Sequence, residues 1–150
     1  MIVTKNKEEL EIMRRAALMV SKTLGMIAAE IKPGVTTLRL DTLAEEYIRD
    51  NGAIPGFKGL YDCPSTLLIS PNEEVVHGIP KEVAIKEGDV LSIDCGAIVD
   101  GFYGDHAYTF TVGEVPQETL DLLERTKNSL YIGIEQFRVG KRVGDVGYAI

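Results

Sequence analysis

Two aspartates on the arms of one expected hairpin are the residues of this chain best placed to do chemistry together. Asp94 and Asp105 flank the pair Asp100-Gly101, which is a strong signal for a two-residue turn between the apolar, β-prone segments around it. If that pair forms the loop, Asp94 lies opposite Ala107. Asp105 is then the diagonal neighbour of Asp94 on the same face of the sheet.

This placement would suit a shared metal site. Diagonal neighbours lie ~7–8 Å apart at Cα, so that their side chains can converge. Two carboxylates aimed at one spot repel each other, and a cation between them relieves the repulsion. A pair of divalent ions about 3.5–4 Å apart would use this spacing well. The alternative is a solvated polar face on an edge hairpin, and strand parity alone favours neither interpretation.

Composition excludes several classes of protein. The chain has 150 residues, of which 45% are hydrophobic, enough for one globular domain over residues 1–150. A formal charge of −7 argues against direct binding to nucleic acid or to an anionic membrane. The first residues turn charged at once and no run could span a bilayer, so we expect a cytoplasmic protein. Cys63 and Cys95 have neither a metal-type nor a redox-type spacing, and we expect buried, reduced thiols.

The elements that must position the aspartates are helices around an antiparallel sheet, a mixed α/β (α+β) fold. A capping pair, Asn6 and Glu9, predicts a long first helix that Pro33-Gly34 ends. Its expected inner stripe is Leu10, Met13, Ala17, Val20, Leu24, Ile27 and Ile31. The remaining predicted elements are a helix capped by Thr36 or Thr37 and ending before Gly52, strands near Thr66–Ser70, Val90–Val99 and Phe102–Val112, and a helix from Pro116 to Gly140.

The end of the chain repeats its beginning. A long helix leading into Pro33-Gly34 and a new helix is echoed by a long helix leading into Gly140 and another helical start. The pattern indicates a duplicated architecture whose second copy has begun before Ile150.

Three segments together resemble the bacterial type I methionine aminopeptidases, which have the pita-bread fold. They are Asn72–Pro80, with the sequence Asn-Glu-Glu-Val-Val-His-Gly-Ile-Pro, then Glu87–Asp94 and Asp100–Asp105. The resemblance covers the whole chain from the first helix onward, but only the first part of such an enzyme. It implies the first of two pseudo-symmetric halves and the start of the second, in agreement with the repeat.

The resemblance also implies roles for residues. Asp94 and Asp105 become ligands of two divalent metal ions, of which Co, Mn, Fe and Zn are all compatible with the ligand types. His77 lies beside the site and hydrogen-bonds the substrate at the scissile bond. The family's remaining ligands, a histidine and two glutamates, would come from segments beyond Ile150, so this chain alone is expected to bind metal weakly and to be inactive.

The substrate pocket is less closely matched. Phe57 and Leu68 are expected to be apolar walls of a methionine pocket, with ordinary core packing as the alternative. Many relatives have Tyr-His-Gly-Tyr or Tyr-His-Gly-Phe where this chain has Leu60-Tyr61-Asp62-Cys63. His106 points to the face opposite Asp105 in the expected register, so it is not expected to be a ligand.

The implied function is removal of the N-terminal methionine from nascent polypeptides by metal-activated water. Nascent N-termini and the ribosome are the expected partners, and the full-length protein is expected to be a monomer. Two alternatives stay open. Prolidases and proline-specific aminopeptidases share the hairpin, but typically carry an additional N-terminal domain, whereas here the catalytic-type fold begins within the first ten residues. Some pita-bread relatives have lost their metal ligands and act as protein-binding modules instead.

Overall fold

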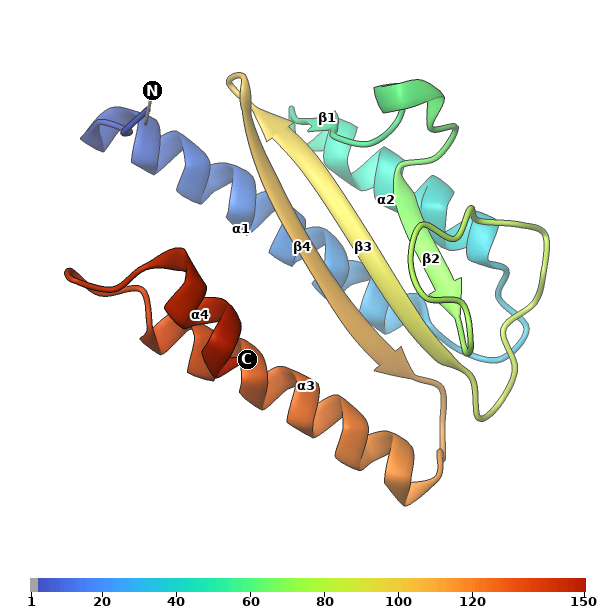
Figure 1. The fold of residues 1–150 in the computed structure, drawn as a ribbon. Helices are drawn as coiled ribbons and strands as arrows, with labels where there is room; N and C mark the ends of the chain where they lie inside the picture. The colour runs from blue at the N-terminus through green and yellow to red at the C-terminus, as the bar shows by residue number, and fades with distance from the viewer. Residues whose placement is uncertain (1–2) are drawn as a thin grey trace. The chain divides into compact units, whose positions relative to one another are not determined.

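A computed structural model describes residues 3–150, which form two compact units (Figure 1). The first unit ends at Glu114 and the second comprises Val115–Ile150. That residues 1–150 form one domain stays a prediction, because it depends on how the two units are arranged.

The first unit is a sheet with two long helices. Its elements are α1 (Lys7–Glu30), α2 (Thr37–Asp50), β1 (Ile54–Pro55), the 3-10 turn η1 (Leu60–Asp62), β2 (Leu67–Pro71), β3 (Val90–Val99) and β4 (Phe102–Thr111). Strand β3 is central: β4 pairs along one edge, β1 and β2 share the other, and all pairs are antiparallel. The three longer strands lie where the sequence predicts them. Strand β1 was not predicted, because two residues ending in proline have no periodicity.

The hairpin of β3 and β4 has the predicted register. Asp100 and Gly101 have φ angles of 48° and 82°, so both adopt the left-handed conformation that a type I′ turn requires. Asp94 pairs with Ala107, and Asp105 pairs with Gly96. Asp105 is therefore the diagonal neighbour of Asp94, as expected.

Alternation along β3 divides the sheet into a covered and an open face. Leu91, Ile93, Cys95 and Ala97 are buried and form the core with α1 and α2, which both pack on this face (Figure 1). The other face carries the alternate residues of β3, and neither α1 nor α2 covers it. Both aspartates belong to this open face.

Helix α1 begins at the predicted capping box, but its buried stripe differs from the prediction. The backbone N–H of Glu9 donates to Asn6 Oδ1 and the N–H of Asn6 donates to Glu9 Oε2, both at 2.8 Å. Ala16, rather than Ala17, is buried, and Leu10 is 53% exposed. The reason is that β4 crosses α1 at Gly104, where a Cβ atom would collide with the backbone of Ala16.

We expect Gly104→Ala to destabilise the chain by about 1–3 kcal/mol or more, because the added methyl group meets backbone that cannot move aside. The matched control is Gly25→Ala on α1, where a Cβ would meet nothing within 4 Å. That change should stabilise by about 0.5–1 kcal/mol, since alanine is the better helix former. Urea unfolding of both variants measures the difference, and equal stabilities would contradict the close approach.

Asp41 ties α2 to the start of β2. It is 6% exposed, and its Oδ1 accepts hydrogen bonds from the backbone N–H groups of Thr66 and Leu67 at 2.9 and 2.7 Å. Burial raises the pKa of the Asp41 carboxyl above its usual 3.8, although the two hydrogen bonds oppose the shift. This contact fixes where β2 begins and therefore the register in which β2 pairs with β3.

Asp41→Ala should cost about 2–5 kcal/mol, because it leaves two buried N–H groups without an acceptor. Asp41→Asn keeps the accepting oxygen and should stay within about 1 kcal/mol of the parent. Because the folded pKa is raised, the parent is most stable below the usual pKa and loses stability as pH rises through the raised value. The asparagine variant should lack this decline in thermal unfolding temperature, and an identical pH profile for both proteins would refute the assignment.

The second unit is a helical pair. Helix α3 (Gln117–Glu135) begins directly after Pro116, as predicted, but ends before Gly140. Helix α4 (Val143–Ala149) follows, and its start is held by the N–H of Arg142, which donates to Asp145 Oδ2 at 2.8 Å. Gly140 and Gly34 have φ angles of 89° and 92°. The same left-handed glycine thus follows the long helix of each unit, in line with the predicted repeat. No helix within residues 3–150 is long and apolar enough to cross a membrane.

Candidate metal centre

The two aspartates lie on the open face of the β3–β4 hairpin. Asp94 is half-buried and Asp105 is exposed. The Oδ1 atom of Asp94 is buried and has no hydrogen-bond partner among the described residues. Buried carboxylate oxygens are almost always hydrogen-bonded or bound to a cation, so this atom is in an environment that favours a positive ligand.

The electrostatics of Asp94 agree with this interpretation. Burial raises the pKa of its carboxyl group above the usual 3.8, and the neighbouring charge of Asp105 raises it further. The charge of His77 acts in the opposite direction. Burial and the charge of Asp105 together disfavour the charged form of Asp94, and a bound cation would offset both effects.

His77 is presented to the site by a loop attached to the outer edge of β2. The N–H of Ile69 donates to the carbonyl of Gly78 at 2.7 Å, and the N–H of Gly78 donates to Ser70 Oγ at 3.0 Å. A Cβ atom on Gly78 would collide with the Ile69 carbonyl. His77 itself has a φ of 60°, an uncommon conformation for a residue other than glycine. The two hydrogen bonds of Gly78 to β2 hold His77 in this conformation.

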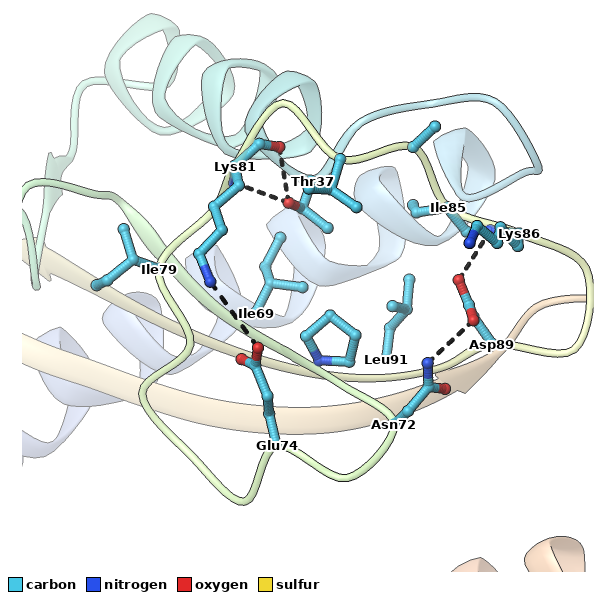
Figure 2. A pocket seen from close by; sticks show the side chains of 13 residues that line it. Thr37, Ile69, Asn72, Glu74, Ile79, Lys81, Ile85, Lys86, Asp89 and Leu91 are labelled. Carbon is cyan, nitrogen blue, oxygen red and sulfur yellow. Dashed lines mark hydrogen bonds and ion pairs between the residues drawn. The ribbon is translucent and has the colours of Figure 1, made fainter.

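The rest of this loop is anchored at both ends, as Figure 2 shows. Asn72 Nδ2 donates to Asp89 Oδ1 at 3.0 Å, and this bond holds the pKa of Asp89 below its usual range. Thr37 Oγ1 accepts from the N–H of Lys81 at 2.9 Å and donates to its carbonyl at 3.0 Å. Lys81 also faces Glu74, with 3.9 Å between the charged groups (Figure 2). The pocket of about 190 Å³ that these residues line does not include either aspartate of the pair.

Two apolar side chains flank the aspartates on the open face. Leu68 of β2 pairs directly with Asp94, so it shares that face. The Phe57 ring lies over Gly96, which is the partner of Asp105. Both apolar residues are half-buried. The structure thus brings Phe57 and Leu68 to the same face as Asp94 and Asp105. His77 lies on the neighbouring loop, where its charge acts on Asp94.

The other predicted residues lie elsewhere. His106 pairs with Cys95 on the covered face, opposite to Asp105, as predicted. Cys95 is buried, and burial raises the pKa of its thiol to about 12. Cys63 is a free thiol as expected but is only half-buried. Its sulfur contacts Ser65, with 3.6 Å to the backbone carbonyl oxygen.

The donors present fit a divalent cation but do not complete a site. Carboxylate oxygens are suitable ligands for such ions, and the partnerless oxygen of Asp94 fits one. Within residues 3–150, however, no three His, Cys, Asp or Glu side chains are grouped so that they could hold a metal.

Comparison with known protein families decides the relationship. Residues 11–150 match the model of metallopeptidase family M24. The chain belongs to this family. Membership in M24 implies a divalent metal cofactor, in agreement with the aspartate pair on the open face.

The chain is similar to M24 members named methionine aminopeptidase. It is 46% identical to the protein from Clostridium acetobutylicum, over all of this chain and 60% of that protein. The crystal structure of the methionine aminopeptidase from Rickettsia prowazekii superposes with a TM-score of 0.97 at 36% identity, over 99% of this chain and 60% of the other. The corresponding Thermotoga maritima structure gives 0.96 at 38% identity, over 100% and 61%. The mixed α/β pita-bread fold predicted for this M24 chain is thereby confirmed.

The match covers all of this chain but only part of each relative. The chain spans about 60% of the length of the curated relatives it matches.

Proposed function

We propose that this chain is the first part of a methionine aminopeptidase in which Asp94 and Asp105 are metal ligands. The observation that carries the proposal is the aspartate pair itself. Two carboxylates share the open face of the hairpin, and one of them has a buried oxygen without a partner. Family membership and the names of the relatives support the reaction and the substrate.

The proposed centre holds two divalent ions, with Co, Mn, Fe and Zn as candidates. When bound, these ions supply Lewis-acid polarisation of the first peptide carbonyl and activation of a water molecule. Asp94 and Asp105 provide hard oxygen ligands from adjacent strands, whose pairing fixes the separation of the carboxylates. The remaining ligands would come from the part of the relatives that this chain does not span.

Other residues of the open face bind and orient the substrate in this proposal. His77 donates a hydrogen bond to the substrate at the scissile bond, where it stabilises developing negative charge. Its anchored loop keeps the imidazole near Asp94 without reorganisation during the reaction. Phe57 and Leu68 contact the methionine side chain, and their half-buried position leaves apolar surface available for it.

The proposed substrates are the N-termini of nascent polypeptides in the cytoplasm. A site that must accept chains as they emerge would work beside the ribosome, and we propose the ribosome as a further partner. The complete protein is proposed to act as a monomer.

The test is methionine release from a Met-Ala-Ser peptide by two proteins. One is this chain alone, which should bind Mn²⁺ weakly and release no methionine. The other is a fusion protein, in which this chain replaces the matching 60% of the Clostridium acetobutylicum relative. The fusion protein should be active. Release of methionine by the chain alone, or an inactive fusion protein that folds and binds metal, would contradict the proposal.

The same proteins separate the two alternative functions. A proline-specific enzyme would prefer a peptide with proline as the second residue over Met-Ala-Ser. A protein-binding module would cleave neither peptide and would lose partner binding on Asp94→Asn without ever having had peptidase activity. Cleavage restricted to Met-Ala-Ser is the result that we expect.

A further inference from the structure

Two glycines bring the segment after β1 into direct contact with β3. The N–H of Gly56 donates to the carbonyl of Gly96 at 2.8 Å. A Cβ atom on Gly56 would lie 2.8 Å from the carbonyl carbon of Gly96 and 3.1 Å from the N atom of Ala97. The two backbones therefore approach more closely than any side chain at position 56 would permit.

The second glycine provides the space for an aromatic ring. A Cβ atom on Gly96 would lie 2.6 Å from Cε1 of Phe57 and 3.0 Å from both Cδ1 and Cζ. Ordinary contacts between carbon atoms are about 3.5–4.0 Å. The ring thus occupies the volume that any other residue at position 96 would need.

This contact lies next to the aspartate pair. Gly96 follows Asp94 by two residues, so its missing side chain would point to the same open face, and it pairs directly with Asp105. On the other side of Asp94 lies Leu68 of β2. Phe57 and Leu68 therefore form two apolar walls beside the carboxylates, and the depth at which the Phe57 ring lies is set by the glycine beneath it.

We infer that Gly96 is a positioning residue for substrate specificity. It admits the Phe57 ring down to the strand and so sets the length of the apolar side chain that fits beside Asp94 and Asp105. The inference rests on the proposed function, since it assumes that the first side chain of the substrate contacts this ring. A methyl group at position 96 would lift the ring by about 1 Å, close to the length that one methylene adds to a substrate side chain.

The test measures binding of two amino alcohols, which lack a scissile bond, to the metal-loaded fusion protein. Methioninol has the long, unbranched side chain and norvalinol a shorter one. Gly96→Ala should shift the ratio of their dissociation constants toward norvalinol by about 10-fold or more, the usual effect of a methylene in an apolar pocket. In a Phe57→Ala background, the same Gly96→Ala change should leave the ratio unaltered. Mn²⁺ affinity should be unchanged throughout.

The inference is overturned if Gly96→Ala leaves the ratio unchanged, or if it shifts the ratio equally with and without the Phe57 ring. If Gly96→Ala does not fold, Phe57→Leu gives the independent measurement. A smaller side chain over the intact glycine should favour phenylalaninol over methioninol by at least about 10-fold relative to the parent, and an unaltered ratio would overturn the inference. The Met-Ala-Ser assay distinguishes a failure of the proposed function from a failure of this inference. If the proposed function is wrong, the parent fusion protein does not cleave the peptide; if only the inference is wrong, the peptide is cleaved but the ratio of dissociation constants does not shift.

Discussion

Asp94→Asn should remove Mn²⁺ binding from this chain and lower peptide cleavage by the fusion protein by at least about 100-fold. Loss of residues that only support metal ligands already costs about 10–100-fold, and a direct ligand should cost more. Asparagine keeps the size of the side chain but not its charge. Asp105→Asn should have the same effect, because the two carboxylates are proposed to share the cations.

The matched control is Asp100→Asn at the tip of the same hairpin. Asp100 is exposed and forms an ion pair with Arg15 at 2.6 Å. Asparagine tolerates its left-handed conformation, so the turn should be preserved. Calorimetric titration with Mn²⁺ should find binding by Asp100→Asn unchanged. If all three variants bind alike, the carboxylates are not the ligands.

Asp94→Asn should also stabilise the metal-free chain. The parent holds a half-buried carboxylate beside a second one, and burial together with that neighbour raises the pKa of Asp94. Its stability is therefore greatest below the usual pKa and declines as pH rises through the raised value. The asparagine variant should unfold at a higher temperature near neutral pH. Simultaneous loss of binding and gain of stability is characteristic of a functional site rather than of a structural one.

His77→Ala should lower kcat of the fusion protein by about 10²–10³-fold with Mn²⁺ affinity unchanged, because the imidazole is proposed to stabilise charge on the substrate and not to hold the metal. The chain has two histidines, and the other provides the control. His106 lies on the covered face, so His106→Ala should leave kcat unchanged. Steady-state kinetics with Met-Ala-Ser measures both.

The unusual backbone of His77 requires a second variant. Alanine is disfavoured at a φ of 60°, whereas asparagine adopts this conformation readily. If His77→Asn retains full kcat while His77→Ala loses it, the loop conformation matters and the imidazole does not. Loss in both variants would support the proposed hydrogen bond.

The hairpin could be predicted from sequence because its determinants are local. The Asp100-Gly101 turn fixes the register, and the two-residue period of a strand then fixes the face of every side chain. The starts of α1 and α2 could likewise be predicted from their capping residues. The choice of Ala16 over Ala17 as the buried position was not predictable, because it depends on where β4 crosses α1.

The site could be predicted only in part, because some of its contacts join segments that are distant in the sequence. Phe57 and Gly96 are far apart in the chain, and only the three-dimensional contact reveals that one makes room for the other. Asp41 does carry a signal in the sequence, since an acidic residue next to Leu40 on the buried side of α2 is unusual. His77 was found through family resemblance alone, since a single loop histidine has no distinguishing pattern.

The most direct test of the central claim is anomalous X-ray scattering from crystals of this chain soaked in Mn²⁺. We predict a peak within bonding distance of the carboxylates of both Asp94 and Asp105 that is absent from Asp94→Asn crystals. Carboxylates that point away from each other, or manganese bound elsewhere while the space between them holds none, would contradict the account.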